Sequence, residues 1–170
     1  PFGSTIYEVG GIKSLPSGLR YVFVDGGMTD NPRPALYEAK YEAMALNRGG
    51  GSGEGSGEGS VEGSVSEGAG EGSAVEGSVE GSVESQTYRI AGKCCETGDV
   101  LIQEQELEHV QVGDLLLVHG TGAYTYSMSS NYNHLPRPAV VFLKNGEARL
   151  AVRRETYEDL LLRDEPYSKR

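Results

Sequence analysis

The chain has 170 residues, a formal net charge of −10 and a mean hydropathy of −0.40. Eight of its 25 acidic residues lie in residues 49–85, which contain no basic residue, and the rest of the sequence has no Lys/Arg cluster. This distribution argues against nucleic acid as a partner, because phosphates are bound by clustered positive charge. The sequence also has no apolar run near the length of a membrane span, which argues against a membrane as a partner.

The first part of the chain predicts strands followed by a helix. Residues 5–13 alternate loosely in polarity, and residues 19–24, which read LRYVFV, have the β-branched and aromatic side chains typical of a strand. A glycine-rich loop follows. We expect a helix near residues 32–47, because Pro32 suits a first helical position and the residues after it have a helix-forming composition.

Residues 49–85 consist almost wholly of Gly, Ser and Glu. Such a composition cannot bury enough apolar surface to offset the entropy of ordering the chain. We therefore expect a disordered insertion that separates residues 1–48 from residues 86–170.

The sequence of residues 86–170 predicts mostly β structure. Turn residues separate several short apolar runs, and short strands at such spacing are typical of an antiparallel barrel or sandwich. A short amphipathic helix is expected over residues 155–162. The fold class is therefore expected to be mainly β with two short helices. The expected strands cover residues 87–91, 100–104, 114–119, 139–143 and 148–152.

Two adjacent cysteines, Cys94 and Cys95, precede Glu96 in the stretch CCETGD. Adjacent cysteines rarely pair with each other, so a disulfide framework is not expected and a reducing, intracellular setting fits better. A thiol beside a carboxylate could act as a nucleophile or as a proton donor. The alternative is that one cysteine fills the core and that Glu96 is solvated. No second Cys/His cluster lies at ligand spacing, so a zinc site is not expected.

Three further residues are candidates for ligand binding. Arg33 and Tyr37 are four residues apart in DNPRPALY, so on a helix they share one face and could bind a carboxylate together. The alternative is an arginine stacked on a tyrosine at the surface. Tyr124, in GTGAY, follows a glycine-flanked turn and could approach a ligand closely, although ordinary turn chemistry explains this pattern as well. The three histidines show no motif.

Three stretches, taken together, resemble the diaminopimelate decarboxylase family: VDGGMTDNPRPALYEAKYEA (24–43), AGKCCETGDVL (91–101) and VHGTGAYTYSMSSNYNHLPRP (118–138). The resemblance covers essentially everything except the Gly/Ser/Glu segment. It implies the C-terminal β-barrel or sandwich domain of an alanine-racemase-like, ornithine-decarboxylase-like enzyme, with the substrate-binding helix before the insertion. The α/β barrel domain of such enzymes is absent from this sequence, and we expect the chain to be a fragment.

The resemblance further implies a pyridoxal-phosphate lyase of lysine biosynthesis that converts meso-2,6-diaminopimelate to L-lysine and CO2, with active sites shared across a homodimer. Cys95 matches the cysteine that protonates the substrate carbon after decarboxylation, in the partner's active site. Glu96 matches the residue that binds the distal amino group, and Arg33 and Tyr37 match those that hold the distal carboxylate. Tyr124 matches a tyrosine near the cofactor and substrate. The lysine that carries the cofactor belongs to the missing barrel.

Two alternatives stay open. The chain could belong to a related pyridoxal-phosphate decarboxylase that acts on another amino acid, or it could be a non-catalytic fragment that only associates with a full-length subunit. In each case we expect the chain alone to be inactive, and we expect a location in the cytoplasm, or in the plastid of a plant or alga. We also expect Cys94 to pack inward, because adjacent side chains on an extended backbone point to opposite faces.

Overall fold

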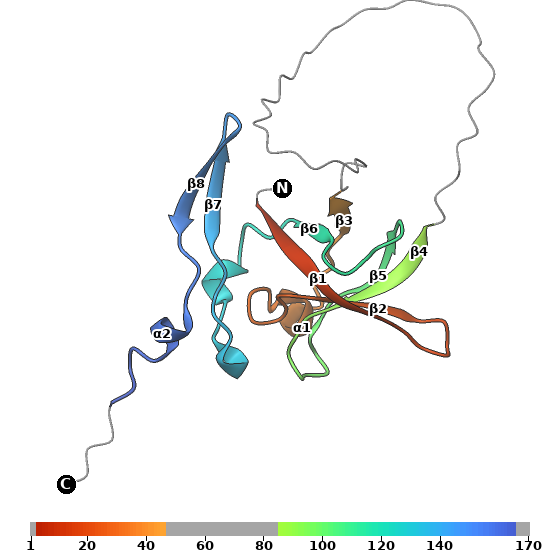
Figure 1. The fold of residues 1–170 in the computed structure, drawn as a ribbon, viewed down its shortest axis with the longest axis horizontal. Helices are drawn as coiled ribbons and strands as arrows, with labels where there is room; N and C mark the ends of the chain where they lie inside the picture. Colours follow the sequence, from red (N-terminus) through yellow and green to blue (C-terminus); the bar gives the residue numbers. More distant parts are fainter. Residues whose placement is uncertain (1–2, 47–84, 166–170) are drawn as a thin grey trace, which may run out of the picture.

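A computed structural model describes residues 3–46 and 85–165 (Figure 1). Most of the expected Gly/Ser/Glu insertion lies outside these described residues. The described chain is mainly β, as expected, with two short α-helices, α1 (Arg33–Tyr37) and α2 (Tyr157–Leu160), and two 3-10 turns, η1 (Tyr126–Met128) and η2 (Tyr132–His134). The strands are β1 (Ser4–Ser14), β2 (Arg20–Val24), β3 (Ala43–Leu46), β4 (Gln86–Ala91), β5 (Val100–Leu107), β6 (Leu115–His119), β7 (Val140–Lys144) and β8 (Glu147–Val152).

Six of these strands form one curled sheet in the order β3-β6-β1-β2-β4-β5. Its two outer strands approach each other, because the backbone N–H of Ala43 on β3 donates to Oε1 of Gln105 on β5 at 2.8 Å. The expected barrel-like curvature is therefore present. The sheet is not purely antiparallel, however, because β2 and β4 run parallel. A parallel pair needs a long crossover, and the connection between β2 and β4 contains α1 and β3.

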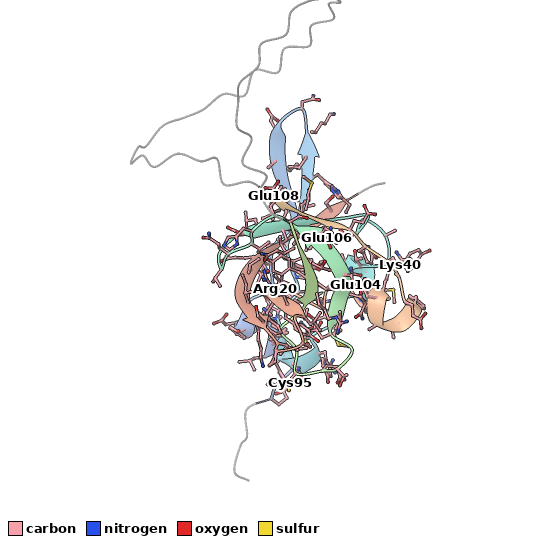
Figure 2. The ribbon with its side chains drawn as sticks, turned by 90° about the vertical axis from the view of Figure 1, so that its right-hand side faces the viewer. Arg20, Lys40, Cys95, Glu104, Glu106 and Glu108 are labelled. Carbon is pink, nitrogen blue, oxygen red and sulfur yellow. The ribbon has the colours of Figure 1, made fainter. Side chains whose placement is uncertain are left out.

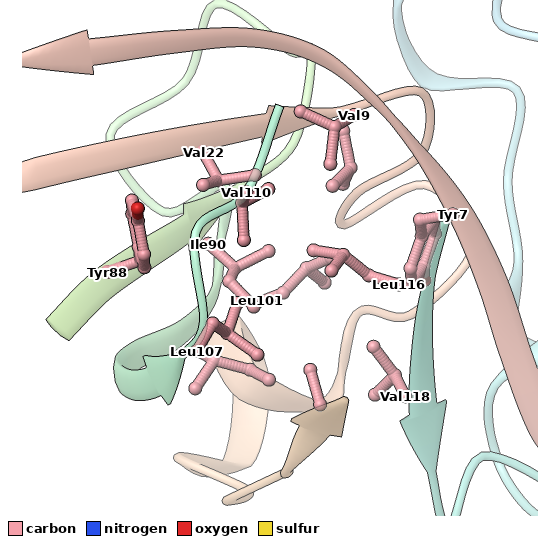
Figure 3. Packing of buried hydrophobic residues seen from close by; sticks show 13 residues of the cluster. Tyr7, Val9, Val22, Tyr88, Ile90, Leu101, Leu107, Val110, Leu116 and Val118 are labelled. Carbon is pink, nitrogen blue, oxygen red and sulfur yellow. The ribbon is translucent and has the colours of Figure 1, made fainter. Parts of the chain in front are cut away.

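The inner face of the curled sheet carries the hydrophobic core (Figure 3). Alternation along β1 turns Tyr7 and Val9 inward, and the same period buries Leu116 and Val118 on β6. Ile90 on β4 is fully buried between its neighbours. Each buried aliphatic side chain contributes about 1.5–3 kcal/mol, so the sheet can hold the loops at its ends in fixed positions.

The helix expected near residues 32–47 is wrong over most of its length. α1 ends at Tyr37, because Glu38 takes a left-handed conformation with φ 54°. The chain then enters β3, which pairs antiparallel with β6 and buries Ala43. Pairing with β6 overrides the helix-forming composition of AMAL, because tertiary contacts routinely outweigh intrinsic helix propensity.

A second, two-stranded sheet is formed by β7 and β8, which stand apart from the curled sheet in Figure 1. Its apolar side chains are exposed, Phe142 by 65% and Leu143 by 80%. The two ends of this hairpin are tied together by Arg137, whose Nε donates to Oε1 of Glu155 at 2.8 Å. Hydrogen bonds from the side chain and the backbone of Arg137 lower the pKa of Glu155 to about 2.

The C-terminal helix is shorter than expected. Residues 155–162 were expected to be helical, but Thr156 is the N-cap and α2 spans only four residues. Thr156 and Asp159 form a capping box, in which each side chain bonds the other residue's backbone N–H. Within residues 3–46 and 85–165, no helix has the length and apolar character needed to cross a bilayer.

Candidate functional site

The loop between β4 and β5, residues 92–99, carries Cys95 and Glu96. Figure 2 shows Cys95 at one end of the molecule, far from Glu108 at the other end of β5. The loop is bent rather than extended. Its shape is fixed by Asp99, whose carboxylate accepts from the backbone N–H of Cys94 at 2.7 Å and whose carbonyl accepts from that of Gly92 at 3.0 Å.

The two cysteines of this loop have different surroundings. Cys95 is exposed, whereas Cys94 is half-buried. Burial raises the pKa of the Cys94 thiol to about 11, and the nearby charge of Asp99 contributes. The expected difference in burial is present, but it arises from the bend and not from strand alternation. Cys94 therefore stays protonated at neutral pH, and Cys95 is the thiol that a ligand can reach.

Glu96 contacts a residue that the sequence did not single out. Its carboxylate accepts a hydrogen bond from the hydroxyl of Tyr132, on η2, at 3.3 Å, and another from the backbone N–H of Thr97 at 3.0 Å. The bond to Glu96 raises the pKa of Tyr132. No local spacing connects residues 96 and 132, so only their closeness in the fold identifies Tyr132.

The helix α1 carries both Arg33 and Tyr37, and their expected four-residue spacing on a helix is confirmed. The Arg33 guanidinium is half-buried and donates to the hydroxyl of Tyr41 at 3.1 Å, while Tyr37 is 62% exposed. Tyr41 was also missed. Residues 33, 37 and 41 recur at intervals of four, and this spacing could have drawn attention to Tyr41.

The turn that leads into α1 is anchored on the sheet by Asp30. Its carboxylate accepts from the backbone N–H of Gly27 at 2.8 Å and from the hydroxyl of Tyr7, which lies on β1. Burial raises the pKa of Asp30. This anchor sets where α1 begins, and with it the position of Arg33.

Beside Arg33 lies an open groove of about 650 Å³. Lys40 and Glu104, labelled in Figure 2, lie on its wall, so the groove offers charges of both signs. The groove also reaches Gly120, at the start of the loop that contains Tyr124. A carboxylate entering here would meet the Arg33 guanidinium.

Tyr124 lies in the loop between β6 and η1 and is 67% exposed. Its backbone has φ 59°, a left-handed conformation that non-glycine residues rarely adopt. The loop is held at Thr121, whose backbone N–H donates to the carbonyl of Gly3 at 3.2 Å and whose hydroxyl accepts from Thr5 at 2.8 Å. The fixed loop thus presents the tyrosine ring outward.

The fold brings two of the candidate segments next to each other. A methyl group added to Gly98, in the cysteine loop, would lie 3.8 Å from the Cβ of Ala35, in the middle of α1. The backbone N–H of Lys93 also donates to the carbonyl of Gly26, in the turn before α1, at 3.1 Å. Cys95 and Glu96 therefore lie beside the helix that carries Arg33 and Tyr37. Within the described part of the chain, no hydrogen bond, ion pair or ring contact joins Tyr124 to the other four, and no group of side chains could hold a metal ion.

Comparisons with known proteins identify the family of the chain. Residues 1–122 match the family model described as "Pyridoxal-dependent decarboxylase, C-terminal sheet domain". The chain is 48% identical over 165 residues to a diaminopimelate decarboxylase of Bacillus subtilis and 40% identical over 168 residues to one of Halalkalibacterium halodurans. These alignments cover 97% and 99% of the chain but only 30% and 31% of the relatives.

A solved structure shows the same architecture. The diaminopimelate decarboxylase of M. jannaschii in co-complex with L-lysine matches with a TM-score of 0.71 and 30% identity, over 96% of this chain and 30% of that one. The chain thus spans about a third of the length of the proteins it matches. Since the family model covers most of the chain and the curled sheet has the matching form, the chain belongs to the pyridoxal-dependent decarboxylases, as their C-terminal sheet domain.

Proposed function

We propose that the whole protein of which this chain forms the C-terminal sheet domain decarboxylates meso-2,6-diaminopimelate to L-lysine and CO2. The observation that carries the proposal is the 48% identity to a diaminopimelate decarboxylase across 97% of the chain. The stretches DNPRPALY and CCETGD lie within this match, and they place a cation and a thiol–carboxylate pair on adjacent segments of the fold.

Pyridoxal phosphate, when bound, supplies the electron sink that accepts the carbanion left by departing CO2. The four lysines that the structure describes are exposed on the surface, so none provides an enclosed attachment amine. Cys95 and Tyr124 are exposed as well, which fits side chains that face a cofactor held by another part of the protein. Tyr124 would contact the cofactor.

Each remaining residue has a role that suits its chemistry. The Cys95 thiol delivers a proton to the substrate carbon from which CO2 has left. Glu96 binds the distal ammonium group. Arg33 binds the distal carboxylate, with Tyr37 as a second donor. A guanidinium left without its carboxylate partner gives discrimination against L-lysine, which lacks that group.

We further propose that the active sites are shared within a homodimer and that the protein works in the cytoplasm. The exposed apolar hairpin β7–β8 supports the view that further protein covers this domain, because contiguous apolar surface of this kind marks interaction sites. Cys95 and Glu96, on the cysteine loop, are likewise exposed.

The full-length protein, supplied with pyridoxal phosphate, is expected to release CO2 and L-lysine in equal amounts from meso-diaminopimelate. The 170-residue chain alone is expected to show no turnover, because none of the lysines that the structure describes offers an enclosed attachment amine for the cofactor. Product release is followed by chromatography, and cofactor attachment by visible absorbance. Turnover by the isolated chain would contradict the proposal. So would a full-length protein that decarboxylates another amino acid but leaves diaminopimelate unchanged.

A further inference from the structure

Asp99 lies at the junction of the two segments that carry the candidate residues. Its side chain is only 3% exposed. One carboxylate oxygen, Oδ1, accepts from the backbone N–H of Met28 at 2.7 Å, and the other, Oδ2, accepts from that of Cys94 at 2.7 Å. One carboxylate thus accepts hydrogen bonds from both the turn before α1 and the loop of Cys95. Met28 and Asp99 are 71 residues apart in the sequence.

The junction has a second bond and a shaped surface. The backbone N–H of Lys93 donates to the carbonyl of Gly26 at 3.1 Å, again joining the two segments. Gly27 and Gly92 lie against the Asp99 carboxylate, so closely that a Cβ on either residue would collide with it. The backbone at Gly27 and Gly92 therefore leaves just enough room for the Asp99 carboxylate.

The Asp99 carboxylate is stabilised by hydrogen bonds from backbone N–H groups. Within residues 3–46 and 85–165 no cation forms an ion pair with Asp99, so two N–H groups stabilise this carboxylate instead. Hydrogen bonds to an ionised acceptor are about twice as strong as neutral ones. Replacing the carboxylate by an amide would turn one acceptor into an N–H donor that faces another N–H donor.

We propose that Asp99 is a positioning residue, which holds the loop of Cys95 and Glu96 in place on the turn before α1. This inference rests on the proposed function. Asp99 is buried beneath the loop and acts through the backbone of Cys94, directly before the thiol. A displacement of about 1 Å in a reacting group can cost on the order of 100-fold in rate.

The test uses the full-length protein loaded with pyridoxal phosphate. Asp99→Asn is expected to lower kcat/KM for meso-diaminopimelate on the order of 100-fold, with the visible absorbance of the bound cofactor unchanged. In a Cys95→Ala background the same substitution is expected to change kcat by less than about twofold, because residues that act as a unit are not additive. An unchanged kcat/KM in Asp99→Asn overturns the proposal. So does an equal further loss in the Cys95→Ala background, which indicates a role independent of the thiol.

Glycine variants give a second test that leaves Asp99 in place. Gly92→Ala, which directs a methyl group at the carboxylate, is expected to lower kcat/KM as Asp99→Asn does. The matched control is Gly10→Ala, whose methyl group would lie 3.8 Å from the Phe23 carbonyl oxygen, an ordinary contact, and which is expected to keep wild-type kinetics. In an Asp99→Ala background, Gly92→Ala is expected to add little, since the colliding group is gone. Full activity of Gly92→Ala overturns the proposal.

These outcomes are separate from those of the proposed function. If the wild-type protein does not decarboxylate meso-diaminopimelate, the proposed function fails before any variant is compared. If the wild type and the Gly10→Ala control are active and the Asp99 and Gly92 variants match them, only the positioning role fails.

Discussion

Replacing Cys95 with alanine is expected to lower the turnover number of the full-length enzyme by about 10²–10⁴-fold, the range that a positioned proton donor contributes. The thiol is exposed on the bent loop between β4 and β5, where a substrate held by another part of the protein can reach it. The protonation of the substrate carbon would then depend on solvent. Steady-state assays of lysine formation measure this effect.

Cys94→Ala is the matched control for this prediction. Cys94 is half-buried, and its thiol has a raised pKa because of burial and the nearby Asp99. Its replacement is expected to change mainly the free energy of unfolding, by about 0.5–3 kcal/mol, which a thermal melt detects. If Cys94→Ala lowers the turnover number as much as Cys95→Ala does, the assignment of the proton donor to Cys95 is wrong.

Arg33→Ala is expected to lower kcat/KM for meso-diaminopimelate by the equivalent of about 2–5 kcal/mol, the usual cost of truncating one partner of a buried hydrogen-bonded charge pair. This corresponds to roughly 30- to 5,000-fold. Arg33 is half-buried at the start of α1 and faces an open groove, so it can reach a carboxylate that enters there. The affinity for pyridoxal phosphate is expected to stay unchanged, because the proposed role of Arg33 involves the distal end of the substrate.

Tyr41→Phe separates the charge of Arg33 from its orientation. The Tyr41 hydroxyl accepts a hydrogen bond from Arg33 at 3.1 Å, and the substitution removes this acceptor without removing the guanidinium. The expected loss in kcat/KM is smaller than that of Arg33→Ala. These expectations are tested by measuring kcat/KM for meso-diaminopimelate and the affinity for pyridoxal phosphate in both variants. Wild-type kcat/KM in Arg33→Ala would show that another group binds the distal carboxylate.

The strands were predictable from the sequence because their polarity alternates and turn residues separate them. Strands β2, β4, β7 and β8 lie within about a residue or two of their expected bounds. On β2, the buried Val22 and Val24 flank the partly exposed Phe23. The helix expected near residues 32–47 failed for a tertiary reason. The composition of AMAL favours a helix, but pairing with β6 makes it a strand.

The candidate site was predictable only in part. The motifs made Cys95 and Arg33 candidates, because each residue type has a chemistry of its own, and their roles remain predictions. They gave no sign of Tyr132, which reaches Glu96 across 36 residues of sequence, or of the hydrogen bond that the Met28 N–H donates to Asp99 across 71. Such contacts depend on how the curled sheet brings loops together, and no local spacing encodes them.

The most direct test of the account is a complementation experiment with two inactive full-length variants. One subunit carries Cys95→Ala; the other lacks the lysine that, by the resemblance, binds the cofactor in the N-terminal barrel. In a mixed dimer with shared sites, one site combines an intact lysine with the intact Cys95 of the other chain. Mixing the two variants is expected to restore part of the lysine-forming activity. No recovery, with mixed dimers shown to form, would contradict a thiol that acts across the dimer interface.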